Sequence, residues 1–145
     1  MVALALAPKP TLDVQLQTHL ANPVLRLRDI TRFAADGGFR AMLVVRSGGF
    51  SVERPFFFDG GALARFLDEL GHLDQPRPGF ARLRASDGPD VLGLELHGRG
   101  DVTVFGVVHE QARQTQSLRF AFTTDQTVLG HFRADIARVW SLPAF

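Results

Sequence analysis

Short runs of alternating apolar and polar residues, joined by glycine-rich turns, constrain the fold of this chain more than any other feature. Seven such runs follow residue 23, at 24–33, 39–45, 50–58, 80–85, 91–98, 101–110 and 117–123. Several of the links between them carry the Asp-Gly and Gly-Gly pairs that tight turns favour. Because short links join antiparallel neighbours, the pattern predicts an antiparallel sheet that is largely a meander. With a further short strand near 12–16, about six to eight strands are expected.

Two segments have the spacing of amphipathic helices instead. In the segment 60–72, apolar residues recur at steps of three and four, namely at Leu63, Phe66, Leu67 and Leu70. Asp59 is the expected N-cap of this helix, and Gly71 is its expected end. The segment 126–140 has a similar stripe at Leu129, Phe132, Ile136 and Val139. The order of strands, helix, strands and helix predicts an α+β fold, with both helices packed on one face of the sheet or at its edges.

The length of 145 residues fits a single domain with its own core. We expect an N-terminal edge segment at 1–23, strands over 24–58, a helix at 60–72, a four-strand meander over 80–123 and a C-terminal helix at 126–140. The apolar run near residue 1 is short and has no basic segment before it, so it is not interpreted as a signal peptide. No apolar run reaches membrane-spanning length, and a cytoplasmic location is expected.

Composition argues against several classes of function. The chain has 16 basic and 15 acidic residues, and both signs alternate along it. A nucleic-acid-binding domain usually shows a basic excess or a basic stripe, so no nucleic-acid partner is expected. The run Phe56–Phe58 could form a base-stacking platform, but successive strand residues alternate in direction, and core packing explains it more simply.

Residues that could support catalysis or metal binding form no recognisable pattern. Cysteine is absent, which excludes disulfides and thiolate chemistry. No two of the five histidines have helical ligand spacing; His97 and His109 would become cross-strand neighbours only if their hairpin paired in a suitable register. The glycines match neither a P-loop nor a dinucleotide-binding motif. We therefore expect no catalytic residue, no cofactor and no metal, and an enzyme remains only a third class of function.

The polar joint "TTDQT" lies where the last strand gives way to the last helix. A nucleophile elbow would require Ser or Cys flanked by glycine here, and none is present. Thr124 or Asp125 can cap the helix, and Asp125 or Gln126 suits the positive end of the helix dipole. Residues Thr124, Asp125, Gln126 and Thr127 are therefore predicted to form a helix cap, with a direct functional contact as the alternative.

Three segments taken together carry a resemblance to a known family. They are "GGFSVERPFFFDGGALARFLDEL" (48–70), "GRGDVTVFGVV" (98–108) and "SLRFAFTTDQTVLGHFRADI" (117–136). In this order they resemble the WapI-type immunity protein family of bacteria. The closing pattern "L.F.F.TDQT.L..F" is the most specific part, and it falls here on Leu118, Phe120, Phe122, Thr124, Asp125, Gln126, Thr127, Leu129 and Phe132.

The resemblance implies a non-enzymatic function. Such proteins are taken to neutralise a cognate polymorphic toxin, made by the same cell or its kin, by binding it. Immunity proteins against nucleases tend to be acidic, whereas this chain is close to neutral, which disfavours a nuclease as the target.

A protein-binding domain that occludes a toxin sterically is therefore the leading hypothesis. The alternative is a general interaction or small-ligand-binding module without a toxin. Interfaces usually depend on a few aromatic or arginine anchors. Strand alternation places five candidate contact residues on the solvated face of the second group of strands: Arg82, Arg84, Glu95, His97 and Arg119.

Overall fold

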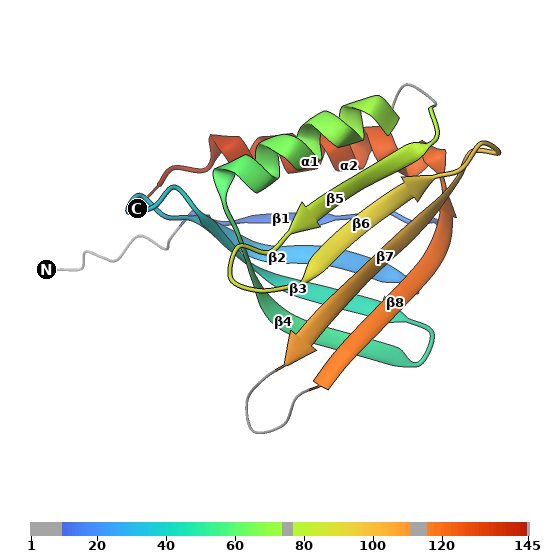
Figure 1. Cartoon of the computed structure of the whole chain (residues 1–145), viewed down its shortest axis with the longest axis horizontal. Helices are drawn as coiled ribbons and strands as arrows, with labels where there is room; N and C mark the ends of the chain where they lie inside the picture. Colours follow the sequence, from blue (N-terminus) through green and yellow to red (C-terminus); the bar gives the residue numbers. More distant parts are fainter. Residues whose placement is uncertain (1–9, 74–76, 111–115, 145) are drawn as a thin grey trace, which may run out of the picture.

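The computed structural model describes residues 10–73, 77–110 and 116–144. In this part of the chain there are eight strands and two α-helices (Figure 1). The elements are β1 (Leu12–Gln15), β2 (Val24–Arg32), β3 (Phe39–Ser47), β4 (Phe50–Phe58), α1 (Gly60–Leu73), β5 (Gly79–Arg84), β6 (Val91–Leu96), β7 (Asp101–Glu110), β8 (Gln116–Asp125) and α2 (Leu129–Ala137). Short 3-10 turns, Gln126–Val128 and Arg138–Ser141, flank α2. The expectation about a signal peptide concerns residues 1–9, which lie outside the described residues.

The strands form two antiparallel sheets of four, in the orders β1-β2-β3-β4 and β5-β6-β7-β8. Each sheet is a simple meander, and each is followed in the chain by one helix. The predicted α+β fold with antiparallel strands and two helices is confirmed. The chain thus repeats the order of four strands and a helix, although no repeated motif is evident in its sequence.

Both helices lie along the same border of the two sheets (Figure 1). The rings of Phe66 on α1 and Phe132 on α2 meet edge to face, with centroids 6.2 Å apart. Each helix packs against the sheet of the other half, α1 against β5 and α2 against β1. The carboxylate of Glu69 on α1 also accepts a hydrogen bond from the backbone N–H of Arg82 on β5, at 2.9 Å. Each half of the chain, consisting of four strands and the helix that follows them, therefore packs its helix on the strands of the other half.

The core fills the space between the sheets and beneath the helices. All buried side chains among the described residues are hydrophobic. The largest of them are Phe39, Phe56, Phe58, Phe66, Leu16, Ile30, Leu43, Leu63, Leu70, Leu83, Leu94 and Leu129. Phe56 and Phe58 are each 1% exposed, while Phe57 points outward beneath the guanidinium of Arg40, 6.0 Å from its ring centroid. The prediction that this aromatic run serves core packing is confirmed for Phe56 and Phe58.

The ends of α1 agree with the prediction at one side and differ at the other. Asp59 caps the helix, because its Oδ1 accepts a hydrogen bond from the backbone N–H of Ala62 at 2.7 Å. The prediction that Gly71 ends the helix is wrong, since α1 continues to Leu73. Leu73 is 2% exposed, so burial of its side chain in the core favours one further half-turn of helix.

A bulge interrupts the pairing of β1 and β2, near the edge of the first sheet. Asp29 has a φ of 54°, a left-handed conformation that is uncommon for a residue other than glycine. The Asp13 carboxylate accepts a hydrogen bond from the Asp29 N–H at 2.8 Å and forms an ion pair with Arg26. The hydrogen bond from the Asp29 N–H, together with Arg26, holds the pKa of Asp13 below its usual value.

Candidate functional site

The outer surface of the second sheet, named here the β5–β8 face, holds the side chains predicted to bind a partner. Arg82, Arg84, Glu95 and Arg119 lie on it, because their strand neighbours point into the core. His97 follows β6 directly, and its Nε2 lies 2.8 Å from the hydroxyl oxygen of Thr103 on β7. The predicted residues thus share one face, as strand alternation indicated.

Two phenylalanines and an arginine form a cluster on this face, between the edge strand β5 and β7. The guanidinium carbon of Arg82 lies 4.4 Å from the ring centroid of Phe80 and 6.0 Å from that of Phe105. The two rings meet edge to face, with centroids 6.4 Å apart and an interplanar angle of 84°. Phe80 is 44% exposed. Cation–π contact offsets part of the cost of this exposure and fixes the guanidinium over the sheet.

Gly93 on β6 determines how Phe105 lies. A Cβ atom at position 93 would be 2.3 Å from Cζ of Phe105 and 2.6 Å from its Cε2, which is closer than atoms can approach. The ring therefore lies directly on the backbone of the neighbouring strand, in the space that a side chain would fill. Beside it is a shallow hollow of about 340 Å³, lined in part by Phe80, Arg82 and Ala121.

The strand register places two arginines at the ends of one row of residues that are paired side by side across the four strands. Arg84 pairs with Val91, Val91 with Val107, and Val107 with Arg119, so two valines lie between two arginines. Within the described residues, no carboxylate lies within ion-pair distance of Arg82, Arg84 or Arg119. This row and the aromatic cluster next to it make an apolar surface bordered by unpaired positive charge.

The opposite end of the β5–β8 face has a different character. Oε1 of Glu95 lies 3.9 Å from Nε2 of His97, and Thr103 and Thr123 continue the row of Glu95 across the sheet. The five predicted residues therefore form two groups, three arginines on one side and a Glu95–His97 pair on the other. Strand alternation predicts that the five residues share a face. It does not predict their separation into two groups, which depends on the register of the strands.

The structure separates the two histidines that were considered as a cross-strand pair. The hairpin pairs Glu95 with Thr103, which carries His109 to the far end of β7, opposite Ser117. There, Nδ1 of His109 lies 2.8 Å from Oδ1 of Asp90, with side-chain exposures of 26% and 14%. Within residues 10–73, 77–110 and 116–144, no three His, Cys, Asp or Glu side chains are grouped as metal ligands.

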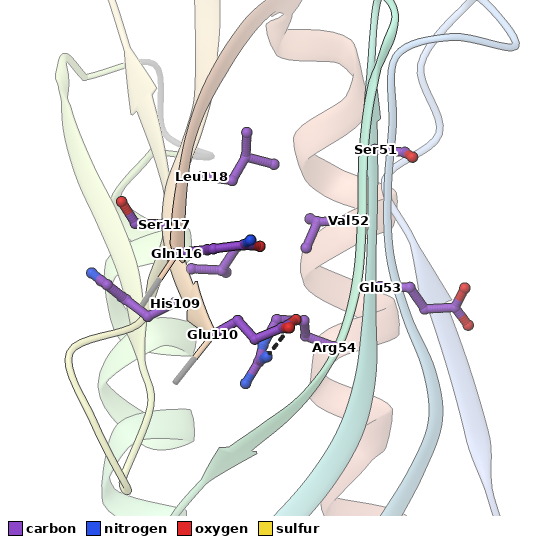
Figure 2. Close-up of a pocket in the computed structure, with 10 residues that line it drawn as sticks. Ser51, Val52, Glu53, Arg54, His109, Glu110, Gln116, Ser117 and Leu118 are labelled. Carbon is purple, nitrogen blue, oxygen red and sulfur yellow. Dashed lines mark hydrogen bonds and ion pairs between the residues drawn. The ribbon is translucent and has the colours of Figure 1, made fainter. Parts of the chain in front are cut away.

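A second hollow opens between β4 and the β7–β8 hairpin, with a volume of about 390 Å³. Figure 2 shows Arg54 and Glu110 meeting in this gap, where Nη1 of Arg54 donates to Oε2 of Glu110 at 3.2 Å. The remaining hydroxyl and ionisable side chains of its lining point away from the gap: Ser51, Glu53, His109 and Ser117. The gap therefore holds an ion pair and the side chain of Gln116, between the apolar side chains of Val52 and Leu118.

In the joint "TTDQT", Asp125 rather than Thr124 is the capping residue, and it caps the 3-10 turn Gln126–Val128. The helix α2 follows this turn, and its own N-cap Val128 makes no side-chain cap hydrogen bond. Oδ1 of Asp125 accepts from the backbone N–H of Thr127 at 2.9 Å and also from the Thr127 hydroxyl. The Thr127 hydroxyl and backbone N–H, with a smaller effect of His19, hold the pKa of Asp125 below its usual value. Thr124 belongs to β8, while the N–H of Gln126 donates to the carbonyl of Gly100 at 3.0 Å.

Comparison with known proteins adds no relative to this description. Neither a scan of protein-family models nor a search of curated proteins returns a match to the chain. The resemblance to WapI-type immunity proteins therefore stays a prediction. No helix in the described part of the chain is long and apolar enough to cross a membrane.

Sequence reasoning missed the apolar residues of the β5–β8 face. Phe105 and Val107 lie on β7, between the arginines of β5 and Arg119 on β8. Phe80 lies on the edge strand β5, opposite Glu95, and is one of the most exposed large apolar residues that the structure describes. The same alternation that selects Arg82 also selects Phe80, two residues before it, so the signal was present.

Proposed function

We propose that this chain is a non-enzymatic protein-binding domain of the immunity type, which neutralises a cognate bacterial toxin by covering its active site. The proposed contact surface is the β5–β8 face. The sequence resemblance suggests the class of partner, and the geometry of the face suggests where that partner binds.

The observation that carries the proposal is the exposed cluster of Phe80, Arg82 and Phe105. Aromatic and arginine side chains are enriched among the few residues that supply most of the energy of protein interfaces. Here they are held in place by mutual contacts and by the glycine beneath one ring, so little side-chain entropy would be lost on binding. A rigid, half-exposed cluster of this kind suits the centre of an interface.

A small-ligand-binding module is the second candidate, and the gap between β4 and the β7–β8 hairpin favours it. Its volume of about 390 Å³ lies within the range of small-molecule sites. Arg54 and Glu110, however, already satisfy each other across this gap. A ligand would have to replace that ion pair, so we rank this function below protein binding.

Affinity capture from cells of the source organism tests the leading proposal. Wild-type protein and the variants Arg82→Ala and Arg40→Ala are immobilised in parallel. Arg40 contacts Phe57 on the outer surface of the first sheet, which makes it a matched control for the cation–π contact of Arg82. Each captured protein is then expressed with and without the chain, and cell growth is measured.

We expect one captured protein to arrest growth when it is expressed alone, and growth to return when wild type or Arg40→Ala is co-expressed. Arg82→Ala should capture less of that protein and protect poorly. If no captured protein is toxic, or if Arg82→Ala protects as well as wild type does, the proposal is wrong in its function or in its surface, respectively.

A further inference from the structure

The charge on the β5–β8 face indicates the chemistry of the partner. Among the described residues, Arg82, Arg84 and Arg119 form no ion pair, whereas the arginines Arg26, Arg28 and Arg54 do. The nearby carboxylates of Glu69 and Glu95 lie outside ion-pair distance of them. Arg84 and Arg119 are exposed, and Arg82 is half-buried against Phe80. The structure thus leaves three guanidinium groups outside ion pairs next to the surface that is best suited to being covered, and they outnumber the two carboxylates near them.

Covering this surface has an electrostatic consequence. A partner that packs on Val91, Val107 and Phe105 removes water from the neighbouring guanidinium groups. An arginine that loses its hydration without gaining a counter-charge is strongly destabilising, whereas one that meets a carboxylate is compensated and can add specificity. The partner must therefore bring acidic groups to the border of the apolar contact.

The strand register also determines how far apart the acidic groups of the partner must be. Arg84 and Arg119 end the same row on β5 and β8, with β6 and β7 between them. Three inter-strand spacings separate the two Cα positions by about 14 Å, which is about the length of four residues of extended chain. The two valines of the row occupy the space between.

We propose that the β5–β8 face binds an acidic segment of a protein partner, with apolar side chains over Val91, Val107 and Phe105 and carboxylates on both sides. One carboxylate reaches Arg84 and the other reaches Arg119. This inference rests on the proposed function in assuming that the β5–β8 face is a protein-binding surface, and it adds the sign and spacing of charge on the partner.

Single-stranded nucleic acid is the competing polyanion, and the positions of the two aromatic rings disfavour it. Base stacking requires aromatic faces that are free. Here Arg82 lies over the ring of Phe80, and one side of the Phe105 ring lies on Gly93.

A peptide selection tests the proposal without requiring the natural partner. A phage-displayed library of random peptides is selected on wild type, on Arg84→Ala/Arg119→Ala and on Arg40→Ala/Arg46→Ala. The last variant removes the same charge from the other sheet. Circular dichroism and thermal unfolding show that all three proteins are folded. The best peptide is then measured by fluorescence anisotropy on each protein, beside a single-stranded oligonucleotide at the same salt concentration.

We expect wild type and Arg40→Ala/Arg46→Ala to select peptides with apolar residues between Asp or Glu residues. Arg84→Ala/Arg119→Ala should bind the best peptide about tenfold or more weakly. Neutral or basic peptides, or equal binding to all three proteins, would overturn the proposal. So would an oligonucleotide that binds wild type and loses affinity in Arg84→Ala/Arg119→Ala. The proposed function is judged separately, because growth protection by a toxin-binding chain does not depend on the result of this selection.

Discussion

Replacing Gly93 with alanine should destabilise the protein by about 1–2 kcal/mol, although this change usually has the opposite effect at a strand position. The new Cβ would lie 2.3 Å from Cζ of Phe105 and 2.8 Å from its Cε1. The ring must move off the sheet, and overpacking of this kind costs about 1–3 kcal/mol. Gly93 has no positive φ, so alanine fits its backbone. Alanine also lowers the conformational entropy of the unfolded chain, which stabilises the folded protein by about 0.4–1 kcal/mol and offsets part of this cost.

The sign of the effect should reverse when Phe105 is absent. In a Phe105→Ala background the Cβ meets no ring, and Gly93→Ala should stabilise the protein by about 0.4–1 kcal/mol. The two substitutions are then coupled by about 2 kcal/mol, near the upper end of what neighbouring residues show. Equilibrium urea unfolding of wild type, both single variants and the double variant measures this coupling. Destabilisation of the same size in both backgrounds would refute the reasoning.

Gly106 provides a matched control on the other side of the same sheet. A Cβ there would lie 2.5 Å from Cε1 of Phe120 and 2.8 Å from the carbonyl oxygen of Val91. The second contact is with backbone, which cannot swing away as a side chain can. Gly106→Ala should therefore stay destabilising in a Phe120→Ala background, in contrast to the reversal expected at Gly93.

Two further predictions concern single carboxylates. Asp59→Ala removes the hydrogen bond to the Ala62 N–H and should lower the free energy of unfolding by about 1 kcal/mol, whereas Asp59→Asn keeps an acceptor and should lose much less; equal losses in chemical denaturation would argue against the cap. Asp13 has a lowered pKa in the folded state, so its contribution to stability is present above its usual value of 3.8 and is lost as the pH falls through the folded pKa. The stability difference between wild type and Asp13→Asn should therefore shrink as urea unfolding is moved from pH 6 to pH 3, and a constant difference would contradict this.

The sequence was sufficient for the elements of this fold because each element is specified locally. Alternation and turn glycines give β4 its bounds, and Asp59 fixes the start of α1. The division into two sheets is not local, since it depends on α1 carrying the chain from β4 to β5 on the second sheet. Gly71 misled the prediction for the same reason, because tertiary burial of Leu73 outweighs the local helix-ending tendency of glycine.

The sequence predicts which side of the sheet carries the candidate residues. It does not predict how those residues are arranged relative to one another on that side. Strand alternation assigns Arg82, Arg84 and Arg119 to one side of the sheet. Which of them share a row depends on the register between strands, and the register depends on turns and packing that the sequence pattern does not specify. The contact of His19 with Asp125 joins residues far apart in the chain, so no local signal indicates it.

The exchange of helices between the two halves bears on how the chain folds. Since the main strand contacts of α1 are with β5 and those of α2 are with β1, each helix packs chiefly on the strands of the other half. A fragment ending after α1 would expose the apolar side of that helix, including Phe66, and would lack the partner ring of Phe132. The two halves should therefore unfold in a single cooperative transition. Separated fragments should recover native structure only when mixed, as two subunits of an obligate dimer do.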